Sequence, residues 1–138
     1  MSGGYIGKIL FIDLSTGEMK EEGLDEKICR DFIGGYGIGA RMLYSRQKAG
    51  VDPLGPENTF GLLTGPFTGT IVPPGLRYMV VAKSPLTGGW GEANSGGYFG
   101  PNLKFAGFDA VFFAGSSIKP VYLLIDNGKP HLKDAIYL

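Results

Sequence analysis

Cysteine is almost absent from the sequence, which has a single one, Cys29. One thiol excludes an internal disulfide framework and any all-cysteine metal site made by this chain alone. On a helical stretch, Cys29 is expected to pack rather than to act as a nucleophile. No apolar run approaches the about 20 residues that cross a bilayer. The start, Met1-Ser2-Gly3-Gly4, lacks the pattern of a secretory signal, so we expect a cytoplasmic protein.

An excess of charge of one sign is also absent, because 13 basic and 13 acidic side chains cancel. No basic stripe favours binding to nucleic acid or to a membrane surface. Apolar residues make up 43 % and charged residues 19 % of the chain, a balance typical of a globular protein. We therefore predict one domain over residues 1–138.

Glycine is the residue present in excess, with 24 among 138 residues, where about 7 % is usual. The glycines are not periodic, which excludes collagen, and they alternate with apolar runs, which argues against a flexible linker. Such a density indicates backbone in unusual conformations, or backbone closely approached by another group.

Most of the chain has the pattern of strands. Strands are expected over residues 5–14, 19–22, 59–64, 78–83, 109–114 and 121–125. The sequence from Asp126 to Lys129 (DNGK) is typical of a hairpin turn leading to a last short strand. With the helices described next, the predicted fold class is α+β.

Two helices are expected near the start. Asp25 is the expected N-cap of the first, which Gly34 and Gly35 would end, and the second is expected over 38–48. A further helical turn is expected at 102–105. The segment 34–39 (GGYGIG) superficially resembles a dinucleotide fingerprint, but it follows a helix and has the wrong spacing. Helix termination is the preferred interpretation.

Two long glycine-rich stretches, 65–77 and 84–100, are predicted as loops. Loops of this length inside a compact domain are usually functional. The first contains Pro73-Pro74-Gly75-Leu76 and ends on Arg77, directly before a strand. A guanidinium suits phosphate, because its planar fork donates two parallel hydrogen bonds. From residue type alone, a surface arginine or one paired with a carboxylate is slightly favoured.

The second stretch contains the most suggestive segment, Asn94-Ser95-Gly96-Gly97-Tyr98-Phe99-Gly100. Successive small residues can turn several backbone N–H groups toward one anion. The amide of Asn94 can both donate and accept. A loop packed only for its shape is an equally good interpretation at this point. No lysine follows in the position that a P-loop requires, so a P-loop is rejected.

Other charged residues give weaker signals. Lys83, Lys104 and Lys119 would supplement a phosphate site, but isolated lysines are usually solvated at the surface. Glu92 and Asp109 lack a second carboxylate at a spacing that marks a catalytic pair, so we assign neither a catalytic role.

The chain resembles the N-terminal domain of the aldehyde:ferredoxin oxidoreductase family. The resemblance covers nearly all 138 residues and is strongest from residue 83 to residue 110. It rests on DLSTGE (13–18), VDPLGPEN (51–58), GPFTGT (65–70), GLRYMVVAKSPLTG (75–88), ANSGGYFG (93–100), LKFAGFDA (103–110) and KPVY (119–122).

The resemblance implies a tungsten enzyme that oxidises aldehydes to carboxylic acids and passes electrons through a [4Fe–4S] cluster to ferredoxin. Two pterins hold the tungsten by dithiolenes, and magnesium bridges their phosphates. The implied fold is a β-rich base of two related, intertwined units with a few helices.

The resemblance also implies a set of cofactor contacts. Arg77 matches the arginine that lies between the pterin and the cluster. Asn94 and Gly96 match other pterin contacts, and Ser95 and Gly97 are their expected neighbours. No catalytic or metal-ligating residue is assigned to this chain, because the family's cluster cysteines and the groups near tungsten lie in later domains.

Departures from the family pattern keep alternatives open. Leu76 stands where many relatives have a glycine, and the family includes a benzoyl-CoA-reducing branch with the same cofactor. A non-catalytic glycine-rich β scaffold is a further alternative. The expected partners are the remaining domains of the enzyme, ferredoxin and an aldehyde. The chain alone is expected to be inactive, and its uncovered apolar surface favours self-association.

Overall fold

The computed structural model describes residues 3–73 and 75–138, and its main feature is a six-stranded sheet of order β2-β1-β6-β3-β4-β5. Only β1 and β6 are parallel neighbours; the other pairs are antiparallel. Met1 and Ser2, which belong to the start considered for a secretory signal, lie outside the described residues. So does Pro74 of the first glycine-rich stretch. The strands are β1 (Lys8–Asp13), β2 (Met19–Gly23), β3 (Phe60–Thr64), β4 (Tyr78–Lys83), β5 (Trp90–Ser95) and β6 (Ala110–Ala114).

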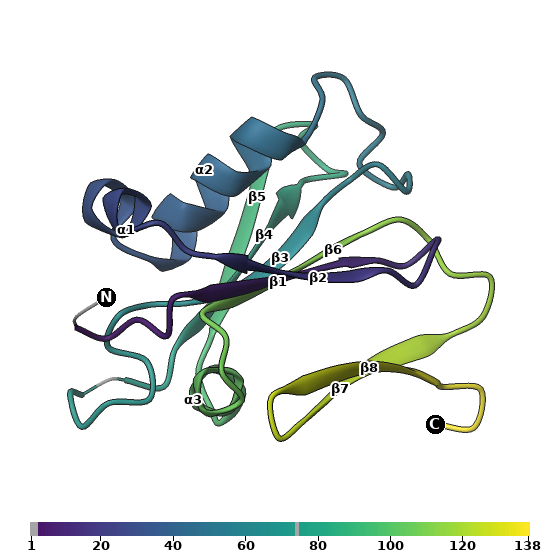
Figure 1. The fold of residues 1–138 in the computed structure, drawn as a ribbon. Helices are drawn as coiled ribbons and strands as arrows, with labels where there is room; N and C mark the ends of the chain where they lie inside the picture. The colour runs from purple at the N-terminus through teal and green to yellow at the C-terminus, as the bar shows by residue number, and fades with distance from the viewer. Residues whose placement is uncertain (1–2, 74) are drawn as a thin grey trace.

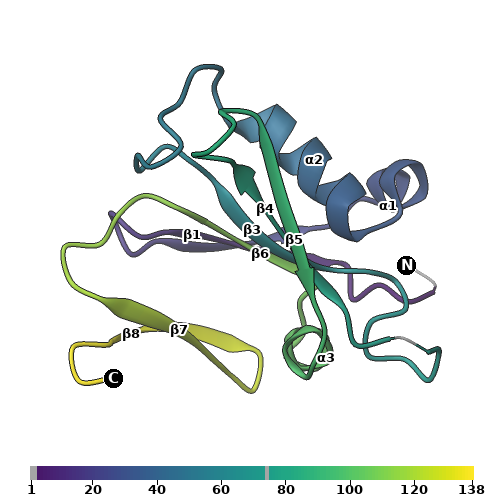
Figure 2. The same ribbon diagram turned by 180° about the vertical axis from the view of Figure 1, so that it is seen from behind.

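Helices cover both faces of this sheet. Helices α1 (Glu26–Phe32) and α2 (Gly35–Arg46) lie on one face. Helix α3 (Phe99–Phe105) and a hairpin of β7 (Val121–Asp126) and β8 (Lys129–Asp134) lie on the other (Figures 1 and 2). Each face therefore has its own apolar layer.

The central strands β1 and β6 are buried on both faces. Because side chains alternate along a strand, Ile9 joins the core beneath α1 and α2, whereas Leu10 and Ile12 join a second core beneath α3 and the hairpin. In β6, Phe112 belongs to the first core and Val111 to the second. Strand β6, late in the sequence, thus lies between the first strand, β1, and β3.

Helix α1 begins as predicted, because the side chain of Asp25 accepts a hydrogen bond from the backbone N–H of Lys27. The glycine-rich segment 34–39 does more than end α1, however, and the prediction of helix termination is incomplete: α2 already begins at Gly35. A Cβ on Gly39 would lie 3.0 Å from both γ-carbons of Val81. Helix α2 therefore approaches β4 so closely that a side chain at position 39 would require Val81 to move, which favours glycine there despite its poor helix propensity of about 1 kcal/mol.

The prediction that 84–100 is one irregular loop is wrong, because it contains β5 and the start of α3. Strand β5 pairs with β4 along its whole length, from Trp90 opposite Lys83 to Ser95 opposite Tyr78. It lies at the sheet edge and is largely exposed. Backbone hydrogen bonds to β4 hold β5 in place. The strand has no alternating apolar pattern by which the sequence would reveal it.

The predicted hairpin turn is confirmed. Asn127 and Gly128 have φ values of 49° and 78°, and positive φ at both central residues is the requirement of a type I′ hairpin turn. Leu123, Ile125 and Leu132 of this hairpin pack against the second core.

Lys104 is buried, so the expectation of a solvated lysine is wrong. Its Nζ lies 3.2 Å from Oδ1 of Asp109 and donates to the carbonyl oxygen of Gly4. The same carboxylate accepts hydrogen bonds from the backbone N–H groups of Ile6 and Gly7, at 3.1 and 2.6 Å. The pair ties the N-terminal segment to α3 and to the start of β6.

The predicted α+β, β-rich fold class is confirmed by this arrangement. Within residues 3–73 and 75–138, no helix combines the length and the apolar character needed to cross a membrane.

Candidate functional site

Arg77 and Asn94, both predicted as cofactor contacts, touch each other at one end of the sheet. Arg77 directly precedes β4, and Asn94 lies opposite Met79 of that strand. Because side chains alternate, positions 77 and 79 share a face, and Asn94 is their cross-strand neighbour. Nη1 of Arg77 donates a hydrogen bond to Oδ1 of Asn94. Strand pairing thus joins two positions that are 17 residues apart in the chain.

Tyr36 is the third member of this cluster, and no sequence pattern indicated it. It lies in the first turn of α2, and its hydroxyl oxygen accepts a hydrogen bond from Nδ2 of Asn94 at 3.0 Å. An arginine has only donors, so Asn94 must present Oδ1 to Arg77 and keeps its NH₂ group for Tyr36. The result is a continuous hydrogen-bonded chain from α2 through β5 to the residue before β4.

The backbone of Arg77 is held from the opposite side. Buried Thr68 donates from Oγ1 to the carbonyl oxygen of Arg77 at 2.8 Å and accepts from the backbone N–H of Gly65 at 3.0 Å. A Cβ on Gly100, in the first turn of α3, would lie 3.1 Å from the same carbonyl oxygen. Sequence reasoning missed Thr68, since a threonine in a glycine-rich loop carries no recognisable signal.

The backbone that follows β5 is bare. A Cβ added to Gly96 or Gly97 would meet no atom within 4 Å, and Gly97 has a φ of +93° that favours glycine. The hydroxyl of Ser95 donates a local hydrogen bond to the carbonyl oxygen of Gly96 at 3.4 Å. Figure 2 shows β5 running toward α3, and this exposed segment links the two. A ligand that approaches there meets main chain.

The charge of Arg77 is not neutralised by a carboxylate in the part of the chain that the structure describes. Its partner is the neutral amide of Asn94, and both side chains are exposed. The described residues therefore do not form the alternative arrangement, in which an acidic residue pairs with Arg77. An uncompensated guanidinium beside bare backbone suits an anionic ligand such as a phosphate.

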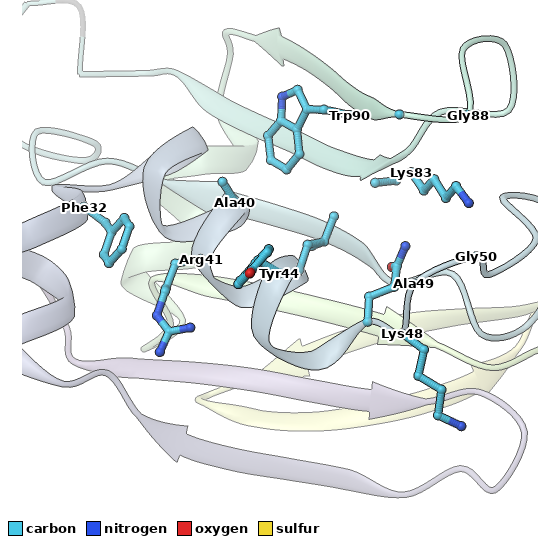
Figure 3. A pocket seen from close by; sticks show the side chains of 14 residues that line it. Phe32, Ala40, Arg41, Tyr44, Lys48, Ala49, Gly50, Lys83, Gly88 and Trp90 are labelled. Carbon is cyan, nitrogen blue, oxygen red and sulfur yellow. The ribbon is translucent and has the colours of Figure 1, made fainter.

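A separate groove of about 930 Å³ lies between α2 and the strands β4 and β5 (Figure 3). Trp90 lines it, with its indole directed from β5 toward α2. Lys83 also lines it, and its Nζ donates to the carbonyl oxygen of Val51 at 2.6 Å. Neither Arg77 nor the stretch 94–97 contributes to the groove.

Two of the three supplementary lysines, Lys83 and Lys104, have partners outside the cluster. Lys83 supports a loop and Lys104 pairs with Asp109, as described above. Among residues 3–73 and 75–138, no group of three or more His, Cys, Asp or Glu side chains is arranged to hold a metal ion. The site is therefore built from Arg77, Asn94, Tyr36 and main chain.

Comparison with known proteins identifies the family. The family described as "Aldehyde ferredoxin oxidoreductase, N-terminal domain" matches residues 9–138. The chain therefore belongs to the aldehyde ferredoxin oxidoreductase family, and the resemblance stated from its motifs is confirmed.

Individual relatives agree with this assignment. The chain is 47 % identical over 132 residues to the tungsten-containing aldehyde ferredoxin oxidoreductase of Pyrococcus horikoshii, covering 96 % of this chain and 22 % of that protein. It is 38 % identical over 134 residues to the aliphatic sulfonate oxidoreductase, WOR-like subunit, of Pyrococcus furiosus, covering 95 % of this chain and 21 % of that protein.

A solved structure has the same fold. The active-site complex BamBC of benzoyl-coenzyme A reductase, in complex with 1,5-dienoyl-CoA, superimposes with a TM-score of 0.94 at 33 % identity. The match covers 97 % of this chain and 20 % of that chain. The present chain therefore corresponds to about a fifth of its relatives' length.

Proposed function

We propose that this chain is the pterin-cofactor-binding N-terminal domain of a tungsten-containing oxidoreductase that oxidises aldehydes to carboxylic acids with ferredoxin as electron acceptor. The observation that carries the proposal is the contact between Arg77 and Asn94, exposed and followed by the bare backbone of Gly96 and Gly97. Two positions matched to one cofactor should lie close together, and the hydrogen bond between Arg77 and Asn94 supports the proposal in this respect.

The residues of this site fit a phosphorylated, planar ligand. The guanidinium of Arg77 keeps donors for phosphate oxygens beyond the bond to Asn94. The segment from Ser95 to Gly97 allows main-chain N–H groups to approach the ligand without a side chain between. Asn94 would contact the edge of the pterin.

When bound, the tungsten bis-pterin supplies the redox chemistry, while this domain binds and orients it. The positive charge of Arg77 would stabilise a more negative state of the group by Coulomb attraction, which is strengthened where water is excluded. The phosphates would be bridged by magnesium. Cys29 alone cannot hold a [4Fe–4S] cluster, which requires about four thiolates, so the cluster would belong to the remaining domains.

The proposal extends to the whole protein. The remaining domains of the same enzyme, ferredoxin and an aldehyde are its proposed partners, and the cytoplasm is its proposed location. Residues 1–138 alone would bind part of the cofactor and would not turn over. Self-association of the isolated domain stays a prediction.

The second candidate is that this chain is the same domain of a benzoyl-CoA reductase-like enzyme. The TM-score of 0.94 with the benzoyl-coenzyme A reductase complex and the 38 % identity to a subunit of an aliphatic sulfonate oxidoreductase indicate that the same domain serves several reactions. The cluster around Arg77 would hold the cofactor in any of them, so it does not select the substrate or the direction of reaction.

Purified full-length protein tests these proposals. We expect tungsten and iron by elemental analysis, and oxidation of an aldehyde with ferredoxin as acceptor. Tungsten with no aldehyde oxidation, but with reduction of benzoyl-CoA, would favour the second candidate. Protein without tungsten or molybdenum, after growth with both, would favour a scaffold that lacks the cofactor and would contradict the proposal.

A further inference from the structure

Arg77 is fixed at its backbone and restrained at its guanidinium. Thr68 and the close approach of Gly100 fix the carbonyl end, as described above. Without a restraint on the guanidinium, the exposed side chain would rotate freely, and the loss of this freedom on ligand binding would cost free energy. A neighbouring side chain that restrains the guanidinium before the ligand binds therefore raises the affinity of the site for that ligand.

Asn94 holds the guanidinium, but Asn94 itself lies on an exposed edge strand. Its amide group can rotate about its terminal torsion, which has a broad energy minimum. A second partner on the NH₂ side restrains this rotation further and helps to keep Oδ1 directed at Arg77. The structure provides one such partner, the hydroxyl of Tyr36.

Tyr36 is well placed to act as an anchor. It lies on α2, and its ring packs against the first core although the residue is only half-buried. Helix α2 approaches the neighbouring strands within contact distance at Gly35 and Gly39, where an added Cβ would lie 2.7 Å from Met79 Sδ and 3.0 Å from Val81. The hydroxyl is thus attached to a helix that packs closely against the sheet.

We propose that Tyr36 is a positioning residue, which holds the amide of Asn94 and through it the guanidinium of Arg77 in the orientation that binds the cofactor. The inference rests on the proposed function for the identity of the ligand, but the arrangement of the three side chains does not. Tyr36 touches no ligand in this account and acts only through Asn94.

The test is the rate at which full-length holoenzyme releases tungsten in mild denaturant, followed by elemental analysis after gel filtration. Tyr36→Phe removes one hydroxyl and keeps the ring, so the packing against the core is retained. Loss of one hydrogen bond is expected to speed release about 3- to 10-fold. Tyr44→Phe is the matched control on the same helix, because Tyr44 is 89 % exposed, and it should leave the rate unchanged.

A double-mutant cycle separates positioning from a general structural role. In an Asn94→Ala background, Tyr36→Phe should have no further effect on release, because the group through which it acts is gone. Equal acceleration by Tyr36→Phe in both backgrounds would overturn the proposal. So would a lowered melting temperature of Tyr36→Phe that accounts for the whole effect.

A second measurement does not depend on the cofactor. Full-length protein produced without tungstate and molybdate is treated with phenylglyoxal, and modification of Arg77 is followed by peptide mass mapping. We expect Tyr36→Phe and Asn94→Ala to speed modification by a similar factor, several-fold, relative to Tyr44→Phe. Unchanged rates would overturn the positioning role. If wild-type protein binds no tungsten but these rates differ as expected, the proposed function fails and the positioning of Arg77 stands.

Discussion

Replacement of Lys104 by methionine should destabilise the domain more than replacement of any exposed charged residue. Lys104 and Asp109 have side chains that are each only 5 % exposed, with Nζ and Oδ1 3.2 Å apart. Removing one partner leaves a buried carboxylate without its cation, which costs about 3–5 kcal/mol. For a chain of this size, 1 kcal/mol corresponds to about 4 °C, so the melting temperature should fall by about 10–20 °C.

Urea denaturation of the 138-residue chain, followed by circular dichroism and fluorescence, measures the loss. Lys8→Met is the matched control. Its ion pair with Glu21 has a similar separation, 3.0 Å, but is exposed, with 55 % and 42 % of the side chains accessible, and such pairs contribute about 0–1 kcal/mol. Hydrogen exchange at Ile6 and Gly7, whose N–H groups bond to Asp109, should accelerate only in Lys104→Met. A loss no larger than in Lys8→Met would refute the reasoning.

Three further predictions concern other parts of the fold. A hydrogen bond from Arg46 holds the pKa of Glu22 below its usual range. The stabilising contribution of the Glu22 carboxylate is therefore present at neutral pH and is lost as the pH falls through that lowered pKa. In urea titrations, Glu22→Gln should be less stable than wild type at neutral pH and equal to it in strong acid. Burial, with a smaller effect of nearby carboxylates, raises the pKa of Cys29, and we expect iodoacetamide to alkylate it slowly in the native protein and rapidly in urea; equal rates would show that the thiol is accessible. A Cβ on Gly61 would lie 2.5 Å from Cε1 of buried Phe112, so Gly61→Ala should lower the free energy of unfolding by about 1–3 kcal/mol, and an unchanged value would contradict this packing.

Strands with a strong apolar pattern were predictable from sequence. The prediction for 78–83 coincides with β4, and that for 109–114 includes all of β6. Asp25 and the DNGK turn were predictable because each acts through local backbone chemistry. Asp25 accepts a hydrogen bond from the N–H of Lys27 in the first turn of α1, and Asn127 and Gly128 adopt positive φ.

Elements that depend on distant partners were not predictable. Gly34 and Gly35 were expected to end the first helix and the second helix was expected over 38–48, yet α2 already begins at Gly35. Its early start depends on close packing that the sequence does not reveal, since a Cβ on Gly37 would lie 2.2 Å from the carbonyl oxygen of Phe32. Lys104 looked solvated because its partners, Gly4 and Asp109, are set by the tertiary fold.

The residues of the candidate site also differ in whether the sequence could reveal them. Arg77 and Asn94 were found through the motifs GLRYMVV and ANSGG, which carry the family resemblance. Tyr36 was missed because its link to Asn94 spans 58 positions and requires α2 to lie on the face that β4 and β5 share. A hydrogen bond between a helix and an edge strand leaves no periodic trace in the sequence.

Tungsten content of full-length Arg77→Ala protein is the measurement that tests the central claim most directly. Loss of charge-assisted hydrogen bonds, about 1.5–3 kcal/mol, should weaken cofactor retention roughly 10- to 100-fold. Arg30→Ala is the control, since Arg30 pairs with Glu26 on the exposed side of α1, at 3.5 Å. The account predicts tungsten-depleted Arg77→Ala and fully loaded Arg30→Ala; equal, full tungsten content in both variants would contradict it.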